Sequence, residues 1–102
     1  MGDPSMKLME FPMAGGAVVA GIGKEENLAD LYDKAYDFQR DGGAGFTAAL
    51  EGSVAGLNWD VIVNLAASAQ DDIDPKYKLV RINCSVGGAL GATTQLSVVG
   101  VA

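Results

Sequence analysis

Clusters of glycine divide this chain into short segments and restrict its fold more than any other feature. The sequence has 14 glycines against three prolines. Most of the glycines stand in small groups, at Gly15-Gly16, Gly42 to Gly45, Gly52 to Gly56 and Gly87 to Gly91. Glycine tolerates the dihedral angles of tight turns, so such groups mark chain reversals. Short segments separated by groups of glycine are typical of strands joined by turns.

Four segments in the second half alternate between inward and outward positions. Alternation with a period of two places one set of side chains on a core and the other toward water or a partner. The expected core-facing sets are Phe46, Ala48 and Leu50; Trp59, Val61, Val63 and Leu65; Val80, Ile82, Cys84 and Val86; and Thr94, Leu96 and Val98. The sequence therefore predicts an all-β protein, a small antiparallel β-sandwich or jelly-roll-like domain.

The first half carries weaker signals. Residues 1–14 are expected to be a vector-derived remnant, MGDPS, followed by an extended N-terminal arm, with residues 15–102 as the single domain. Within that domain, 15–22 reads as a strand. The segment from Leu28 to Asp33 is expected to be a short helix or a turn with Asn27 as its N-cap, and a strand should follow over roughly 34–40.

Composition excludes several classes of function. The formal net charge is −6 and the isoelectric point is about 4.3, which disfavours nucleic acid and anionic membrane surfaces as partners. The chain has no histidine and a single cysteine, Cys84. Histidine catalysis, histidine metal sites and an internal disulfide are therefore excluded. No apolar run reaches the roughly 18 residues of a membrane span.

The remaining chemical candidates each have a simpler interpretation. Asp71, Asp72 and Asp74 stand close enough to suggest a calcium loop, but their spacing is that of an ordinary exposed turn. Glu51 and Asp60 face outward on neighbouring strands and could approach each other as a carboxylate pair. Cys84 is expected to be a small buried hydrophobe. We therefore expect no catalytic residue, no metal and no cofactor.

Apolar residues on the outward side of the strands suggest a contact surface. Ile62, Leu79 and Val99 lie opposite the expected core residues. Because a monomer rarely leaves a large apolar patch in water, these three residues are candidates for binding a partner or another copy of the chain. Trp59 is expected in the core with Val61.

The second half of the chain resembles a known group of proteins. The stretch EGSVAGLNWDVIV and the later DPKYKLVRINCSVGGALGATTQLSVVG resemble small β-sandwich virion structural proteins of tailed bacteriophages. The turn and tryptophan are also similar to those of discoidin-like sandwiches. The matching residues are Glu51, Gly52, Ser53, Gly56, Asn58 and Trp59, then Tyr77, Val80, Arg81, Ile82 and Asn83, and finally Val98 and Gly100.

This resemblance implies a non-enzymatic capsid decoration or cement protein. Such a protein would be made in the bacterial cytoplasm and would reside in the virion. Its partners would be copies of itself, with a trimer favoured, and the major capsid protein. The N-terminal arm would become ordered on binding, with Phe11 and Met13 as its apolar anchors.

Two other functions stay open. One is a carbohydrate-binding module of a phage tail or host-recognition device. It would use an exposed aromatic ring, Trp59 or Tyr36, with Asn58 and Asp60 as hydrogen-bonding partners. The other is an enzyme subunit or assembly factor, for which the sequence offers no set of residues.

Overall fold

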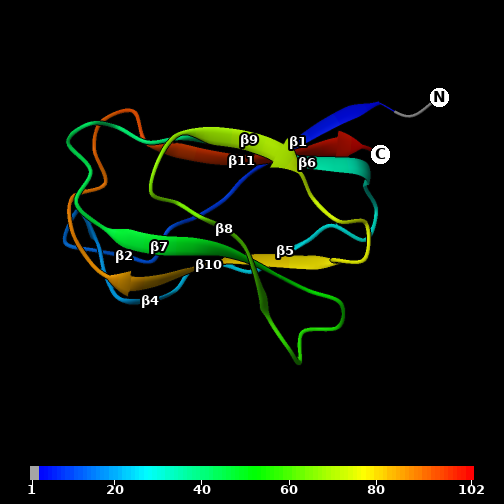
Figure 1. Ribbon diagram of the computed structural model, residues 1–102, viewed down its shortest axis with the longest axis horizontal. Coiled ribbons are helices and arrows are strands. Elements are labelled where there is room, and N and C mark those ends of the chain that lie inside the picture. Colours follow the sequence, from blue (N-terminus) through cyan, green and yellow to red (C-terminus); the bar gives the residue numbers. More distant parts are fainter. Residues whose placement is uncertain (1–2) are drawn as a thin grey trace.

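Two antiparallel sheets lie face to face in this computed structural model, which describes residues 3–102 (Figure 1). The first sheet has the order β1 (Pro4–Leu8), β11 (Gln95–Val101), β6 (Tyr32–Gln39) and β9 (Ala69–Asp72). The second has the order β4 (Gly21–Ile22), β10 (Leu79–Val86), β7 (Thr47–Ser53) and β8 (Asp60–Asn64), and β5 (Glu26–Asn27) also pairs with β10. A hairpin of β2 (Met13–Ala14) and β3 (Ala17–Val18) completes the fold. The predicted all-β sandwich is confirmed.

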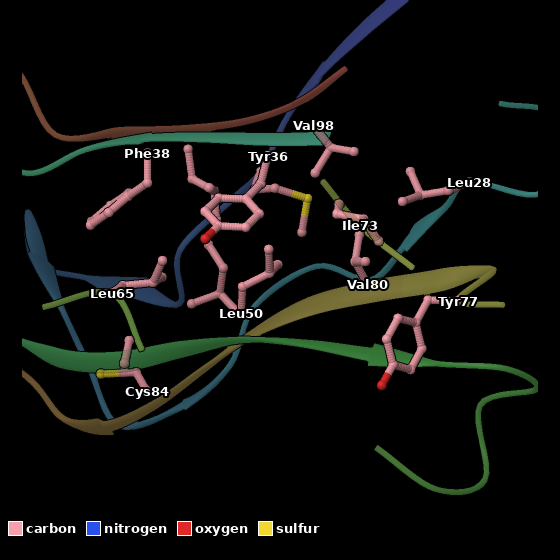
Figure 2. Packing of buried hydrophobic residues seen from close by; sticks show 14 of the residues in the cluster. Leu28, Tyr36, Phe38, Leu50, Leu65, Ile73, Tyr77, Val80, Cys84 and Val98 are labelled. Carbon is pink, nitrogen blue, oxygen red and sulfur yellow. The ribbon is translucent and has the colours of Figure 1, made fainter. Parts of the chain in front are cut away.

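The core lies between the two sheets and draws on both (Figure 2). Leu50 and Ile82 from the second sheet and Leu96 and Val98 from the first are almost completely buried. These residues occupy the inward positions that the alternation predicted. Cys84 is also buried, as expected, and its thiol is free. The two-residue period therefore identifies the central core residues of the longest strands, but Val86, which was also expected in the core, is 57% exposed because the register shifts between Cys84 and Val86.

The predicted helix at 28–33 is wrong, and the predicted turn is correct. The Asn27 side chain does accept a hydrogen bond from a backbone N–H, that of Ala29 at 2.8 Å. The chain then closes a single turn, with the Leu31 N–H donating to the Leu28 carbonyl at 3.0 Å, and continues as β6. Asparagine favours such local turns as readily as helix caps. Residues 3–102 contain no helix, and hence none that could span a membrane.

The predicted N-terminal arm is part of the sandwich instead. Residues 4–8 form β1, which pairs along its whole length with β11, from Pro4 opposite Val101 to Leu8 opposite Ser97. Met9 is buried directly after it. Two residues that we attributed to a vector-derived remnant, Pro4 and Ser5, thus belong to a strand, while residues 1–2 lie outside the described range. Pairing with β11 decided this outcome, because a short segment such as PSMKL has little strand signal of its own.

The expected strand at 15–22 is divided in the structure. Gly15 and Gly16 have φ values of 60° and 81° and form the turn of the β2–β3 hairpin. The chain returns to an extended conformation at β4, which pairs with β10. Glycine suits this turn because it adopts positive φ without a steric penalty.

A β-bulge in β8 reverses the predicted faces of its first half. Leu50 pairs with Val63 but Glu51 pairs with Val61, so Ile62 is an extra residue in the ladder. An extra residue shifts the alternation by one position. Val61 therefore points outward, against the prediction, whereas Ile62 packs against the core. The prediction of Ile62 as an outward residue is wrong for the same reason.

The loop from Gly87 to Ala92 follows β10 and leads to β11 without forming a hairpin between them. It joins β10 in the second sheet to β11 in the first and thus crosses between the layers. Gly88 and Val18 exchange two backbone hydrogen bonds of 2.9 Å along this crossing. The two strands are neighbours in sequence but not in a sheet.

Candidate functional site

The outer face of the second sheet carries an ion pair at its centre. Arg81 on β10 lies opposite Glu51 on β7, and its Nε donates to Glu51 Oε1 at 2.8 Å. The Asn83 side-chain amide donates to the other oxygen, Oε2, at 3.3 Å. These residues alternate with the buried Leu50 and Ile82, so their side chains leave the sheet on the side away from the core. Both carboxylate oxygens of Glu51 are occupied, and the residue is only 9% exposed.

Trp59 covers the arginine of this pair. The Arg81 guanidinium carbon lies 4.0 Å from the centre of the indole ring. A guanidinium over an indole is a favourable cation–π arrangement, and Arg stacks on aromatic rings more readily than Lys. The prediction of Trp59 in the core is wrong, because the bulge in β8 turns this end of the strand outward. We refer to Trp59, Arg81, Glu51 and Asn83 as the Trp59 platform.

Exposed apolar side chains lie on the neighbouring strands and on the loop that precedes Trp59. Val61 stands beside Glu51 in the same cross-strand row and is 57% exposed, and Ile22 stands beside Asn83. The loop that leads into Trp59 adds Val54 and Leu57, which is 84% exposed. This loop extends below the second sheet in Figure 1. We refer to these four exposed side chains, Val54, Leu57, Val61 and Ile22, as the apolar rim of the platform.

Two local features hold the loop in position. The Ser53 hydroxyl accepts a hydrogen bond of 2.8 Å from the Gly56 N–H. Gly56 has a φ of 83°, a conformation that favours glycine. The glycines and the serine of EGSVAG thus form the turn that places Trp59 against Arg81, and their role there is structural.

The structure brings together two of the three residues predicted to bind a glycan, Asn58 and Asp60, whereas Trp59 has a different partner. Asp60 accepts a hydrogen bond of 3.0 Å from the Tyr77 hydroxyl, and burial together with this bond raises the pKa of Tyr77. Asn58 is exposed and lines a hollow of about 180 Å³ together with Asp60 and Leu57. Trp59 instead meets Arg81.

The other aromatic candidate and the carboxylate pair are also placed differently from the predictions. Tyr36 is buried between the sheets and is not an exposed platform. Asp60 pairs with Gly52, the residue after Glu51, so the two carboxylates point to opposite sides of the sheet. The suggested Glu51–Asp60 pair is therefore wrong.

The five residues predicted to contact a partner do not form one surface. Phe11 makes an edge-to-face contact with Phe46 at 5.2 Å between ring centres and packs against the core. Met13 is exposed in the β2–β3 hairpin. Leu79 and Val99 are half-buried on the outer faces of different sheets, and Ile62 packs inward.

The aspartate cluster is divided between a strand and a turn. Asp71 and Asp72 belong to β9, which pairs with β6, and Asp74 lies in the turn that follows. All three side chains are exposed. Over residues 3–102, no group of three or more acidic, cysteine or histidine side chains is arranged to hold a metal ion.

The polar centre of the Trp59 platform was not predicted as a unit from the sequence. A usable signal was present, since Glu51 and Arg81 are opposite charges at outward positions of two strands. What could not be predicted was that β7 and β10 are adjacent and in the register that brings Glu51 opposite Arg81.

Comparisons with protein-family models, with curated proteins and with solved structures found no match.

Proposed function

We propose that this protein is a non-enzymatic virion structural protein of a tailed bacteriophage that binds the assembled capsid shell as a decoration or cement protein. The observation that carries the proposal is the Trp59 platform with its apolar rim. The proposal also draws on the resemblance described above, whose residues include Glu51, Trp59, Arg81 and Asn83. These side chains are therefore assigned to recognition of the shell.

The composition of the Trp59 platform suits a protein–protein contact. Tryptophan and arginine are enriched among the residues that dominate binding energies, and they act best when surrounded by apolar contacts that exclude water. Here Arg81 is held by Glu51 on one side and by the indole of Trp59 on another. Side chains that are already fixed lose less conformational entropy on binding.

The mechanism would be stabilisation by linkage. A protein that binds the assembled shell but not its separated subunits stabilises each site by RT ln(1 + [L]/Kd), where [L] is the free concentration of the protein. A free concentration of 100 times the Kd corresponds to about 2.7 kcal/mol per site. Many repeated sites on a shell would multiply this effect.

Binding to shells of the source phage tests the proposal. We expect the protein to co-sediment with shells and to raise their melting temperature. Leu57→Ser and Trp59→Ala should each weaken binding at least tenfold, because both remove contacts from the platform or its rim. Tyr32→Ala is the matched control, since Tyr32 is an exposed aromatic residue of the first sheet. Absence of binding to the shells, or variants that bind as tightly as wild type, would refute the assignment.

Glycan binding is the second candidate, and the side chains of the Trp59 platform favour it over an enzymatic role. An indole beside amide and carboxylate groups is the combination that sugar-binding faces use, stacking on the ring and hydrogen bonding around it. Asn83 would take the place of the predicted Asn58 and Asp60, since both carboxylate oxygens of Glu51 already accept hydrogen bonds from Arg81 and Asn83. Titration of the fluorescence of Trp59 with phage-receptor polysaccharides distinguishes the two functions. Saturable quenching by sugars without shell binding would favour the glycan function.

A further inference from the structure

Strand β1 exposes an unpaired backbone edge. It is the terminal strand of the first sheet, and among residues 3–102 its one pairing partner is β11. The Asp3 carbonyl accepts from the Ala102 N–H at 2.9 Å, and the Met9 N–H donates to the Leu96 carbonyl at 2.8 Å. Odd-numbered residues of this strand therefore direct their backbone groups toward β11. Because these directions alternate along a strand, Met6 and Leu8 direct theirs away from the sheet.

The position of Pro4 agrees with this assignment. Proline has no N–H to donate, so it is tolerated in a sheet only where that group would face away from the ladder. Pro4 is an even-numbered residue of β1, and its missing N–H falls on the free edge. The free edge thus offers the carbonyls of Pro4, Met6 and Leu8 and the N–H groups of Met6 and Leu8.

The other sheet edges are less suited to pairing with a further strand. β9 at the opposite end of the first sheet carries Asp71 and Asp72. β8 contains the bulge at Ile62, and β4 and β5 have only two residues each. Short, bulged or acidic edges are the devices by which proteins discourage further pairing. β1 has five residues in regular register.

We infer that two copies of this chain associate through antiparallel pairing of β1 with β1 about a twofold axis at Met6. In this register residue n faces residue 12 − n of the second copy, and all five residues of the strand take part. Met6 of each copy exchanges two hydrogen bonds with Met6 of the other. The Leu8 N–H of each copy donates to the Pro4 carbonyl of the other. The first sheets would then join into one continuous sheet across the two copies.

Side chains at this edge are complementary to themselves under the same axis. Met6 and Leu8 stand on the outer face and are 60% and 53% exposed. Next to them on that face is Val99, which pairs with Met6. Pairing would bring both methionines and both leucines together and extend the apolar area over the joined sheets.

Charge also favours this register. Lys7 is the one charged residue within β1. The twofold register sets it diagonally across from Asp3 of the second copy, and this contact occurs twice. Lys7 also lies diagonal to Lys7 of the second copy, a like-charge contact that the two Asp3–Lys7 pairs offset. Lys7 at an edge would otherwise discourage pairing.

The inference is independent of shell binding. It replaces the trimer that the resemblance implies with a twofold dimer, and the protein alone suffices to test it. If the protein forms no dimer, the role proposed for the Trp59 platform is unaffected, because that platform lies on the second sheet and β1 on the first.

Sedimentation velocity over a range of concentrations tests the inference. We expect a reversible monomer–dimer equilibrium in wild type. Met6→Pro should raise the dimer Kd at least tenfold, because it deletes the outward N–H. The β1–β11 ladder should survive, as it does with Pro4 in the same strand. Met6→Ala is the matched control, since it shortens the side chain but keeps the N–H, and it should weaken the dimer less than Met6→Pro.

Two further measurements keep the test decisive should the proline variant unfold. Backbone amide exchange in wild type should show protection of Met6 and Leu8 that grows with protein concentration, while Lys7 and Met9 stay protected at all concentrations. Asp3→Lys and Lys7→Asp should each weaken the dimer when made alone. The double variant, which exchanges the two charges, should restore it. A wild-type protein that is monomeric throughout, or a trimer unaffected by Met6→Pro, would overturn the inference.

Discussion

Replacing Gly52 by alanine should destabilise this protein, because no space exists for the added methyl group. A Cβ built at Gly52 would lie 2.7 Å from Cγ of Tyr77 and 2.8 Å from Cδ1 of Ile62. Carbon atoms that are in contact but not bonded to each other usually lie about 3.5–4.0 Å apart. The two neighbours differ in how easily they can move. Ile62 can rotate its terminal methyl group, whereas the ring of Tyr77 is held by its hydrogen bond to Asp60.

Overpacking of this kind costs about 1–3 kcal/mol. We place Gly52→Ala in the upper half of that range, since one of the two clashing groups is a ring atom and not a chain end. For a domain of about 100 residues, each kcal/mol lowers the Tm by roughly 4–8 °C. Urea unfolding followed by circular dichroism gives the free energy of unfolding directly. Trp59 fluorescence then reports whether the platform is disturbed along with the fold.

Two variants distinguish this mechanism from a general intolerance of glycine replacement. Gly42→Ala adds a methyl group that has no heavy atom within 4 Å, at a residue with no positive φ. It should be neutral or stabilising by about 0.4–1 kcal/mol. Combining Ile62→Val with Gly52→Ala removes the Cδ1 contact but leaves the clash with Tyr77, so it should not restore stability. The reasoning is refuted if the free energy of unfolding of Gly52→Ala lies within about 0.5 kcal/mol of the wild-type value, which is the usual range of a neutral surface change.

Two further changes probe the polar contacts. Asp41 accepts hydrogen bonds from the backbones of Gly43 and Thr93, which hold its pKa below the ordinary value of 3.8. A lowered folded pKa stabilises the fold above the unfolded pKa, and this contribution is lost as pH falls through the folded value. Asp41→Asn should therefore be less stable than wild type at neutral pH, and the difference in urea midpoint should shrink in acid; a constant difference would contradict this origin. Arg81→Met should cost about 1–3 kcal/mol by leaving Glu51 with a single donor, and thermal unfolding beside the double variant with Glu51→Gln should show that the two losses are not additive.

The interior of the long strands was readable from local pattern because each position there has only two choices, inward or outward. Leu50, Ile82, Cys84 and Val98 were placed correctly on that basis alone. The apolar residues recur every second position, and only one phase of that repeat buries them all. Glycine clusters likewise located the turns around Gly15 and Gly56 without any knowledge of the tertiary fold.

Errors arose where a single residue changes the phase or where strands are joined across the core. Ile62 is an extra residue in its ladder, and nothing in DVIVN distinguishes a bulged strand from a regular one. The burial of Lys34 was not predicted at all; this residue follows Asp33 at a φ of 50° and is turned into the interior. Its Nζ donates to the Tyr77 carbonyl at 2.7 Å, and burial lowers the pKa of Lys34. A lysine is buried only where hydrogen-bond acceptors are available to its ammonium group, and here they belong to a segment that is distant in sequence.

The sequence by itself determined that this chain is all-β, that turns fall at Gly15 and Gly56, and which central residues of its longest strands are buried. Each of these features rests on local chemistry: glycine conformations and a two-residue period. Only the tertiary structure decided that residues 4–8 form an edge strand and that Glu51, Arg81 and Trp59 meet on one face. Both depend on which strands are neighbours and in which register. That choice is made by burial and hydrogen bonding summed over the whole sandwich, so no single segment contains it.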